Sequence, residues 1–565
     1  MTLLEELKQK ISQALSVSSV VFSYPPSSDL GDLSVACFEL AKNKKISPLQ
    51  MAAELATELQ VVPNLKKYFS EIKALGPYLN FFIDSKYLAS ELIPKIRQKK
   101  EKFGSNHLSH SQRIMVEYSN GNTHKEYHIG HLRNIAYGDA IAKLLAVNGY
   151  RVIPVSYIND FGIHTAKTIW NWQRNTVWDS RQEDKGYLLG KCYTEASQIL
   201  TQHPEFKEEV GAIMKEIESR RGSSYDLWLE TRGWSIDYFS SIYKELNIKF
   251  KKIFYESEVI FAGLKLVDEL TKKGILVRSE GALIANLEEF NLGVLPVIRS
   301  DGTALYPVAD LALASEKFKE YNLDESIYVI DVRQSLYFKQ LFKVLELTGY
   351  KPAVFHLSYD FVTLPEGMMA SRTGNVITYE DLKNSILRKL TEETQRRHTD
   401  WTAIRVNQVA LALTIATIKF EMLKVNADKI ITFNIEEAAK FEGYTACYLQ
   451  YGYARLKSIV RKEDWKFCFG QPDLKKLTEI LEKDILIKLA KYEEVVKLSG
   501  VKYNPSELTK YLFELVQLSN DYYHSVNILK AEEPIRRARL ALIKEIGQVI
   551  KNGLAILGIE VLEEM

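Results

Sequence analysis

The histidines His128 and His131 lie with Lys125 and Gly130 in one short stretch of the sequence, residues 120–131. Lys125, His128, Gly130 and His131 follow an apolar segment that predicts a buried strand, and the residues after them predict a helix. At such a strand-to-helix turn, the free N–H groups and the positive dipole end of the helix favour anions. Imidazoles and an ammonium would suit a nucleotide triphosphate whose α-phosphorus is attacked, and Gly130 would let the ligand approach the backbone.

A second candidate for a nucleotide site is residues 367–375, a glycine-bounded loop that follows a predicted strand. Its Ser371 and Arg372 could hold phosphates, and loops of this kind often close over a substrate. Taken alone, the stretch is better explained as an ordinary glycine loop. Its combination with the first motif favours a role at the same nucleotide site.

The elements that must position these residues alternate between strands and helices. Strands are predicted over residues 113–118, 151–158, 282–286, 327–332 and 354–363. A helix predicted over 130–149 joins two of these strands into a βαβ unit, which implies a doubly wound parallel sheet of Rossmann-like type. The predicted fold class is therefore α/β, with ligands bound at the carboxyl ends of the strands.

The remaining patterns divide the chain into four expected parts. Residues 1–110 predict a small N-terminal α/β domain that ends in a charged and polar linker. Residues 111–365 predict the catalytic domain, with a helical insertion at about 165–250. Residues 366–435 contain the second loop and a linking helical region, and 436–565 predict an all-α C-terminal bundle.

Composition excludes some classes of protein without choosing among the others. The chain has 565 residues and a formal net charge of +2, so several domains are expected and the total charge does not indicate nucleic-acid binding. Four scattered cysteines without a CxxC pair argue against a zinc ribbon or a disulfide framework. We therefore expect no protein-bound metal and a reducing, cytoplasmic compartment. No apolar run approaches the roughly 20 residues that span a bilayer, so no membrane association is expected.

Residues 128–131 resemble the HIGH signature of the class I aminoacyl-tRNA synthetases, which small nucleotidylyltransferases also carry. Residues 367–375 resemble the KMSKS loop of the same class. The loop departs from the usual pattern, because Met368 and Ser371 occupy the lysine positions and Ala370 replaces a serine. The missing positive charge must come from another residue.

Lys125 is the natural candidate for that charge. Some arginyl-tRNA synthetases likewise combine a degenerate second motif with a lysine upstream of the first motif. The whole chain resembles that family: residues 116–119, Asn122, Lys125 and residues 128–133 match its version of the first motif. The two ends of the chain resemble its appended tRNA domain and its anticodon-binding domain. The resemblance implies an arginine–tRNA ligase that activates L-arginine with ATP to arginyl-adenylate and transfers it to the 3′ end of tRNA(Arg).

Further expectations come from the resemblance alone. Mg²⁺ accompanies ATP, held largely by phosphates and water. The first step usually requires bound tRNA in this family, and a monomer is the family's expected state. Tyr78 and Asn80 match positions that touch the tRNA elbow, and Tyr448, Tyr451 and Met565 match positions on the anticodon side. Core packing with a satisfied hydroxyl is the alternative explanation for each tyrosine.

An arginine site calls for carboxylates and hydroxyls that accept the forked N–H groups of a guanidinium. Tyr306 and Asp310 lie four residues apart, so on a helix they share a face, although a single acid is more often a solvated surface charge. The resemblance assigns arginine binding to Glu117, Asn120, Asn122, His128, Glu256, Tyr306, Asp310 and Gln334. It assigns ATP binding to Asn122, Gly130, Met368 and Met369, and catalysis to Lys125, His128, His131, Ser371 and Arg372.

Three alternatives remain open from the sequence. Another class I synthetase is the nearest, but the acidic pocket favours arginine. A small-molecule nucleotidylyltransferase would not need the helical C-terminal part. A tRNA-binding relative that has lost catalysis is kept open by the degenerate second loop, and is opposed by the intact histidines and Lys125.

Overall fold

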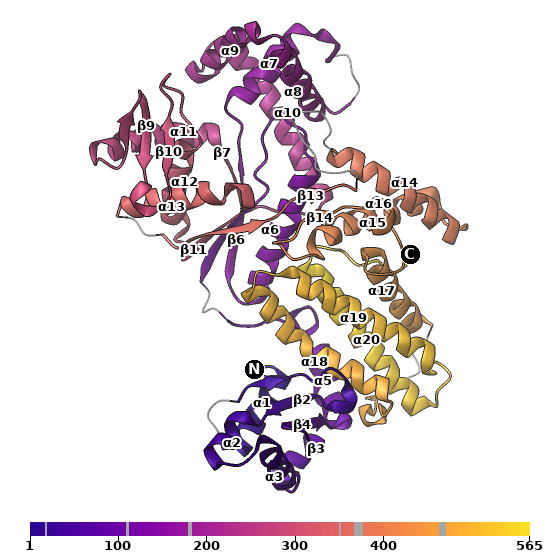
Figure 1. Cartoon of the computed structure of the whole chain (residues 1–565). Helices are drawn as coiled ribbons and strands as arrows, with labels where there is room; N and C mark the ends of the chain where they lie inside the picture. Colours follow the sequence, from indigo (N-terminus) through magenta and orange to yellow (C-terminus); the bar gives the residue numbers. More distant parts are fainter. Residues whose placement is uncertain (17–19, 109–111, 179–182, 350–351, 366–376, 463–470) are drawn as a thin grey trace.

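The computed structural model is an elongated molecule (Figure 1). The structure describes residues 1–565 except 17–19, 109–111, 179–182, 350–351, 366–376 and 463–470. A small N-terminal module lies at one end and a group of helices formed by residues 163–245 lies at the other. The parallel sheet lies between them, next to the C-terminal helices.

Within the described ranges, five strands form the sheet that carries the first motif. Their order is β12 (Val354–Tyr359), β11 (Glu325–Asp331), β5 (Arg113–Glu117), β6 (Arg151–Ile158) and β7 (Lys252–Tyr255). Every neighbouring pair is parallel. The run β5, α6 (Ile129–Val147), β6 is the predicted βαβ unit, so the prediction of an α/β fold with a parallel sheet is confirmed.

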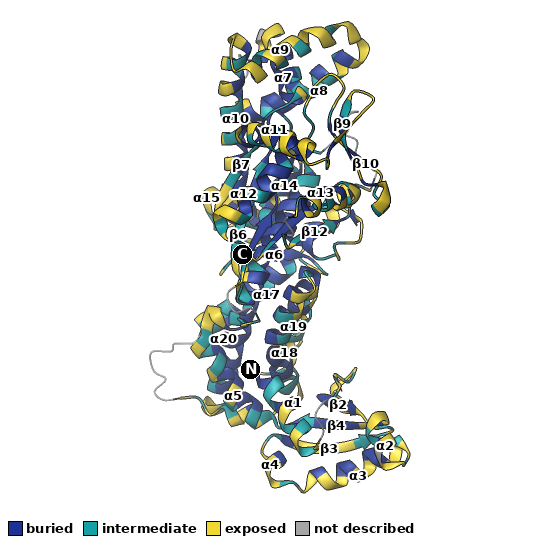
Figure 2. Ribbon diagram, turned by 90° about the vertical axis from the view of Figure 1, so that its left-hand side faces the viewer, coloured by how far each residue is buried: buried dark blue, intermediate teal, exposed yellow. Residues whose placement is uncertain are grey.

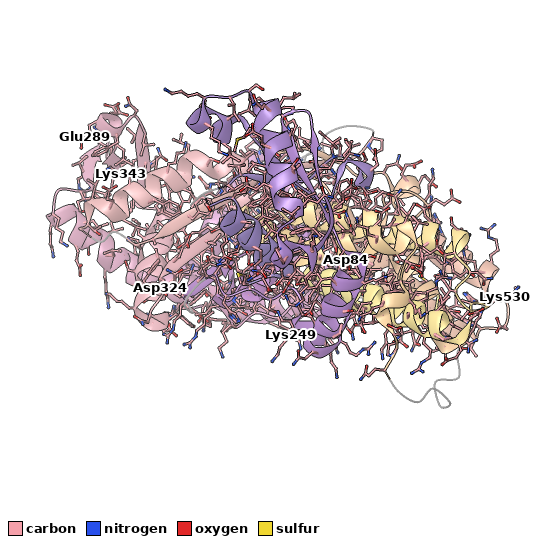
Figure 3. All side chains as sticks on the ribbon, turned by 90° about the horizontal axis from the view of Figure 1, so that it is seen from below. Asp84, Lys249, Glu289, Asp324, Lys343 and Lys530 are labelled. Carbon is pink, nitrogen blue, oxygen red and sulfur yellow. The ribbon has the colours of Figure 1, made fainter. Side chains whose placement is uncertain are left out.

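The central strand and its helix are buried because their sequences are apolar. Residues 114–117 of β5 are buried, as expected for a parallel strand covered on both faces. Most of α6 is also buried, and the C-terminal helices cover the side that the sheet leaves open. Figure 2 shows that buried residues gather where the sheet meets these helices. Charged side chains such as Lys249, Asp324 and Lys530 lie at the periphery (Figure 3).

Some predicted strands differ from those in the structure. β9 (Ala282–Asn286) lies in a separate antiparallel sheet with β8 (Val277–Ser279) and β10 (Val294–Ile298). The strand predicted over 354–363 is interrupted, and its second part, β13 (Val362–Thr363), pairs with β14 (Ile431–Thr432) from the helical half. The sequence prediction missed β7, a short edge strand of four residues that begins with a lysine.

Helices connect the strands and complete the site. They are α11 (Glu256–Lys272), α12 (Pro307–Tyr321) and α13 (Ser335–Leu347). The helical insertion contains α7 (Ile163–Arg174), α8 (Lys185–Gln202), α9 (Lys207–Ser219) and α10 (Ser223–Glu245), with short 3₁₀ turns η3 (Thr176–Trp178) and η4 (Pro204–Phe206). Its small cores include the buried tryptophans Trp170, Trp172 and Trp228. The insertion therefore has apolar packing of its own beside the sheet.

The C-terminal part is helical, as predicted. Its helices are α14 (Tyr379–Arg397), α15 (Ala403–Leu423), α16 (Ile435–Ala438), α17 (Ala446–Arg461), α18 (Ile480–Val501), α19 (Pro505–Ser525) and α20 (Glu533–Ile556), with the turn η8 (Leu474–Lys476). Threonines cap several of them: the side chains of Thr378, Thr402 and Thr445 each accept a backbone N–H three residues later. Capping of this kind sets where each helix begins.

One of these helices, α15, is long and apolar enough to cross a membrane by length and composition. The sequence prediction found no such run. In the structure, 72% of its most apolar 18-residue window is buried inside the protein, so α15 is packed as a core helix. It contacts α6, α14 and α17.

The N-terminal module contains a four-stranded antiparallel sheet within the described residues. Its order is β1 (Phe22–Ser23), β2 (Leu33–Ala36), β4 (Tyr78–Ile83) and β3 (Phe69–Leu75), and its helices are α1 (Leu3–Ala14), α2 (Phe38–Lys44), α3 (Pro48–Gln60), α4 (Pro63–Lys66) and the turn η1 (Ser28–Leu30). The helix α5 (Ser85–Lys99) and the turn η2 (Lys100–Lys102) lead to the part that contains the parallel sheet. Ion pairs between Lys8 and Glu494 (2.7 Å) and between Lys483 and Asp32 (2.9 Å) join the module to α18.

Candidate active site

The first motif lies on a turn between β5 and α6, as predicted. Ser119 and His124 hold left-handed backbone conformations (φ 59° each) in this turn. His124 is fully buried, and its Nε2 lies 2.8 Å from the hydroxyl of Thr231 on α10. Burial lowers the pKa of His124 to about 3. This histidine therefore anchors the turn to the helical insertion and stays neutral.

His128 and His131 stabilise the start of α6. Nδ1 of His128 accepts the N–H of Gly130, and Nδ1 of His131 accepts the N–H of His128, both at 3.1 Å. Because each Nδ1 accepts, each neutral ring carries its hydrogen on Nε2 and can donate it. Burial, with help from Lys125, lowers the pKa of His128 to about 4, and burial lowers the pKa of His131 well below its usual value. Near pH 7 both rings are neutral hydrogen-bond donors.

A cavity of about 400 Å³ opens beside these rings. It is lined by Asn122, His128, Gly130, His131, Arg133 and Arg333, among others. A Cβ on Gly130 would lie only 3.0 Å from the His128 ring, so glycine keeps this part of the helix start open. The cavity thus combines imidazole donors and guanidinium groups with the positive end of the α6 dipole, which suits a nucleotide phosphate.

Arg133 fastens α6 to two distant segments. Its side chain is almost fully buried and donates to the carbonyl oxygens of Phe361 and Lys429 at 2.9 Å. It also donates to Ala427 at 3.0 Å and Asn426 at 3.3 Å. Burial lowers the pKa of Arg133 to about 10, so the guanidinium remains charged near pH 7. The start of α6 is therefore tied to the segments that lead into β13 and β14.

The remaining residues predicted for catalysis and ATP binding lie on two segments. Lys125 lies near the site, with Nζ 5.0 Å from the ring centroid of Tyr193 on α8. Met368, Met369, Ser371 and Arg372 lie outside the described residues. On the C-terminal side of that loop, Tyr379 donates its N–H to the carbonyl of Tyr127 at 2.7 Å. The backbones of His128 and Thr378 form an isolated antiparallel β-bridge. The chain after the second motif therefore runs beside the first motif.

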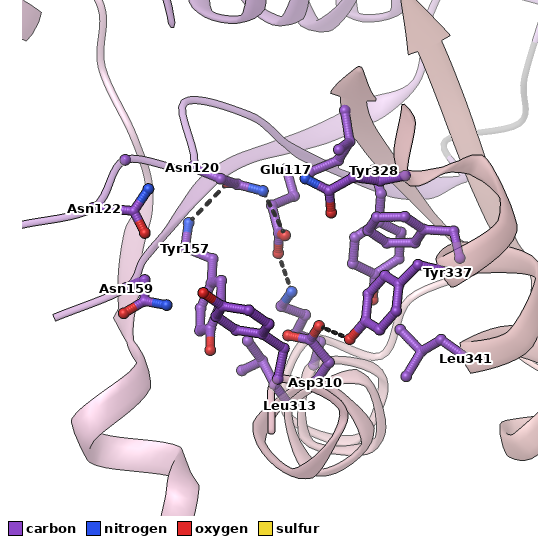
Figure 4. Close-up of a pocket in the computed structure, with 16 residues that line it drawn as sticks. Glu117, Asn120, Asn122, Tyr157, Asn159, Asp310, Leu313, Tyr328, Tyr337 and Leu341 are labelled. Carbon is purple, nitrogen blue, oxygen red and sulfur yellow. Dashed lines mark hydrogen bonds and ion pairs between the residues drawn. The ribbon is translucent and has the colours of Figure 1, made fainter. Parts of the chain in front are cut away.

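A second cavity, of about 310 Å³, adjoins the first. Six of the predicted arginine-binding residues line it: Glu117, Asn120, Asn122, Tyr306, Asp310 and Gln334 (Figure 4). Asn120, Asn122 and Gln334 line both cavities, so the cavities share a wall. Another predicted residue, His128, lines the first cavity. A ligand in the second cavity would therefore lie next to a nucleotide in the first.

Asp310 lies on the first turn of α12, and Tyr306 is the N-cap residue immediately before this helix. The Tyr337 hydroxyl donates a hydrogen bond to Asp310 Oδ2 (Figure 4). Burial raises the pKa of Asp310 to about 6, whereas the Tyr337 hydrogen bond opposes the shift. Asp310 is therefore mostly ionised near pH 7, and a guanidinium could pair with it.

Glu256, the eighth predicted residue, follows β7 and is close enough to Asp310 to interact electrostatically. Within the described part of the chain, its Oε2 is buried without a hydrogen-bond partner. Burial, followed by the charge of Asp310, raises the pKa of Glu256 to about 9. Asp160 holds the next residue, Ser257, through its N–H at 2.8 Å and its hydroxyl at 2.7 Å. Glu256 does not line the arginine cavity itself, but next to Asp310 it offers a neutral carboxyl whose Oε2 lacks a partner.

We expect arginine binding to release a proton from Glu256. The guanidinium stabilises the ionised carboxylate, which is protonated below pH 9 in the empty site, so affinity should rise with pH towards 9. Calorimetric titration at pH 7.5 should be done in two buffers with different ionisation enthalpies. The difference between the two binding heats should correspond to the release of up to one proton per arginine bound. In Glu256→Gln the difference should vanish. Equal heats for the unaltered protein would contradict this assignment.

Comparison with known proteins identifies the family. Residues 92–435 match the family model described as tRNA synthetases class I (R), catalytic domain. A relative named arginine–tRNA ligase from Bdellovibrio bacteriovorus is 34% identical over 551 residues, covering 96% of this chain and 93% of the relative. The chain belongs to the arginyl-tRNA synthetase family. An arginine–tRNA ligase from Clostridium perfringens is similar to this synthetase at 33% identity over 564 residues, covering 99% of each chain.

The ends of the synthetase and its three-dimensional structure agree with this family. Residues 1–83 match the arginyl tRNA synthetase N terminal domain, and residues 449–565 match the DALR anticodon binding domain. The solved arginyl-tRNA synthetase of Thermus thermophilus superposes with a TM-score of 0.81 at 26% identity and covers 100% of both chains. The likeness therefore extends over the whole length.

At the anticodon-binding end of the synthetase, Tyr451 and Met565 meet in a cavity of about 400 Å³. Its other lining residues include His398, Trp401 and Arg455. The rings of His398 and Trp401 stack 3.8 Å apart, and Arg455 donates to the Tyr451 hydroxyl at 3.0 Å. Flat rings and a guanidinium are groups on which an unpaired base can stack.

The other predicted tRNA residues differ in accessibility. Tyr448 lies outside that cavity lining, and its hydroxyl accepts from Asn520 at 2.9 Å. In the N-terminal module, Tyr78 is 42% exposed and packs against the exposed ring of Phe38. Asn80 is buried on the same strand. Contact between Asn80 and tRNA stays a prediction, and Tyr78 presents the more accessible surface.

Sequence reasoning missed several residues of the arginine cavity in this synthetase. They are Lys317, Tyr157 and Tyr337. Lys317 follows Asp310 by seven residues on α12, which places both on one helix face. That spacing was a usable signal. Tyr157 and Tyr337 reach the cavity only through the packing of β6 and α13, which the sequence does not specify.

Proposed function

We propose that the adjoining cavities of this arginine–tRNA ligase bind L-arginine and ATP so that the arginine carboxylate lies beside the α-phosphate. The shared wall of Asn120, Asn122 and Gln334 is the observation that carries this assignment. Asp310, Tyr306 and Glu256 would hold the guanidinium end. Glu117 and Asn122 would face the ammonium and carboxylate ends.

The first chemical step is an in-line displacement. An oxygen of the arginine carboxylate attacks the α-phosphorus of ATP, the P–O bond to the β-phosphate breaks, and pyrophosphate leaves with the electron pair. Neither this step nor the transfer requires a protein nucleophile, so catalysis is mainly positioning and charge stabilisation. His128 and His131 would donate from Nε2 to phosphate oxygens, and Lys125 would supply a positive charge. Met368, Met369, Ser371 and Arg372 are proposed to complete the nucleotide site.

Mg²⁺ is proposed to arrive with ATP. Among the described residues, no group of three or more His, Cys, Asp or Glu side chains could hold a metal ion. A magnesium ion held mainly by phosphate oxygens and water needs no such group. When bound, it would neutralise phosphate charge, while the side chains named above orient the reactants.

The second step transfers the activated arginine to tRNA. The 3′-terminal ribose hydroxyl of tRNA(Arg) attacks the acyl carbon of arginyl-adenylate, and AMP leaves. We propose that Tyr448, Tyr451 and Met565 contact the anticodon side and that Tyr78 and Asn80 contact the elbow. The aromatic lining near Tyr451 and the exposed ring of Tyr78 support these assignments.

We assign these tasks to successive parts of the chain. Residues 1–110 form the elbow-binding domain, 111–365 the catalytic domain with its insertion at about 165–250, 366–435 the second loop and linking helices, and 436–565 the anticodon-binding domain. The matches to family models at 1–83, 92–435 and 449–565 support a similar division. The proposal includes a cytoplasmic monomer, on the pattern expected for this family.

Arginine-dependent exchange of radioactive pyrophosphate into ATP tests the proposal. With tRNA(Arg) present, we expect exchange that depends on arginine, and we expect little exchange without tRNA. Exchange in both conditions would retain the enzyme and remove the tRNA requirement. Absence of exchange in both conditions, with tRNA binding intact, would favour a relative that has lost catalysis.

A further inference from the structure

The arginine cavity contains a positive charge of its own. Lys317, on α12, is 1% exposed, and its ammonium forms an ion pair with Oε2 of Glu117 (Figure 4). It is the one cation among the described residues that line this cavity. Nζ also lies 5.0 Å from the ring centroid of Tyr328 and 5.3 Å from that of Phe254. A site that must attract a guanidinium therefore keeps a fixed ammonium in its wall.

This ammonium acts on carboxylates at both ends of the proposed arginine position. It contacts Glu117 directly, and the second oxygen of Glu117 accepts from Asn120 at 3.2 Å. Its charge also interacts with Asp310, which lies two helical turns before it on α12. A ligand that extends from Glu117 to Asp310 must therefore pass through the field of Lys317. The position of the ligand's side-chain cation along this path then determines how strongly Lys317 repels it.

Arginine, lysine and ornithine differ in that position. The ammonium of lysine occupies the place of the guanidinium carbon of arginine, and the ammonium of ornithine occupies the place of its Nε. Neither has the terminal N–H groups that would reach beyond this point to Asp310 and Glu256. A compact ammonium also concentrates its charge, whereas a guanidinium spreads it over a planar fork. A short ammonium side chain would meet the field of Lys317 without full compensation from the carboxyl groups.

We propose that Lys317 is a specificity-determining residue, an internal cation that excludes the shorter ammonium side chains of lysine and ornithine. This inference rests on the proposed function, because it takes the cavity to be the arginine site. Lys317 selects by repulsion, whereas Asp310 and Glu256 select by attraction. A purely structural role for Lys317, to hold Glu117 in place, would change the affinity for all three amino acids together.

The test compares inhibition by lysine and ornithine with the KM for arginine, in pyrophosphate exchange with tRNA present. In Lys317→Met and Lys317→Gln, both inhibition constants should fall by at least about 10-fold relative to the KM for arginine, since one unit charge a few ångström away has been removed. Lys317→Arg keeps the charge and should preserve the ratio. Direct calorimetric binding of the three amino acids gives the same ratio without turnover.

Lys419→Met is the matched control. Lys419 is also buried (2% exposed) and pairs with Asp139 at 3.7 Å, but it lies on α15 away from the arginine cavity. Its replacement should leave the ratio unchanged. An unchanged ratio in both neutral Lys317 variants would overturn the proposal while leaving the arginine–tRNA ligase reaction intact. Failure of the unaltered protein to exchange with arginine and tRNA would instead remove the proposed function on which this inference depends.

Discussion

Replacing Lys125 with alanine should reduce arginine-dependent pyrophosphate exchange by at least about 100-fold, the usual loss when one group that stabilises transition-state charge is removed. The described residues place Lys125 on the turn before His128, and both histidines are neutral near pH 7. The second motif lacks its usual lysines, so little other ammonium charge is available from the motifs. The loss should fall mainly on kcat, because the charge on the phosphates develops during displacement.

Lys191→Ala provides the control for Lys125→Ala. Lys191 lies on the neighbouring α8, is 33% exposed and pairs with Glu183 at 3.1 Å. Exposed pairs of this kind contribute little, so exchange should change by less than about 2-fold. Lys125→Arg should recover part of the activity because it restores the charge. Adenylate formation at the unaltered rate in Lys125→Ala would show that the charge comes from elsewhere.

Asp310→Asn should lower kcat/KM for arginine by about 100-fold or more, as expected when one partner of a buried charged pair is lost. Asparagine keeps the volume and can still accept the Tyr337 hydroxyl, so the cavity shape should survive. The KM for ATP should change little, because Asp310 lines the arginine cavity only. In the unaltered protein, affinity for arginine should also fall below pH 6, where Asp310 becomes protonated in the empty site.

Glu258→Gln is the control for Asp310→Asn. Glu258 lies on α11 near Glu256, but its side chain is 53% exposed. Its carboxylate forms a long ion pair with the guanidinium of Arg232, at 3.9 Å. Removing its charge tests whether any nearby acid affects arginine use through long-range attraction. We expect kcat/KM to stay within about 2-fold of the unaltered value, since exposed charges are screened. Equal losses in both variants would show that total charge, and not Asp310, governs binding.

The sequence was sufficient to predict the parts of the fold that depend on local patterns. The βαβ unit around α6 and the helical C-terminal half follow from apolar periodicity, which the structure reproduces. The antiparallel placement of β9 could not be predicted, because a short apolar strand does not specify its partner. Likewise, β13 and β14 pair residues that lie 69 positions apart, a contact that no local pattern contains.

The site shows the same division between local and long-range information. The first motif and the pair Tyr306–Asp310 lie on continuous segments, and their proximity follows from one turn and one helix start. The resemblance to a known family supplied Glu256 and Gln334. Neither source indicated that Glu256 would be neutral, since that depends on burial among distant elements, whereas Lys317 could have been found from its spacing of seven residues after Asp310 on α12.

The contacts of Arg133 determine where the molecule can bend. Its planar fork binds carbonyl groups at Phe361 and at residues 426–429 together, so none of these groups can move far without breaking bonds to the others. The helix α6 and its sheet are therefore held together with Phe361 and residues 426–429. A bending motion that keeps these bonds, begun at the anticodon-binding end, would reach α6 as a displacement of the helix together with Phe361 and residues 426–429.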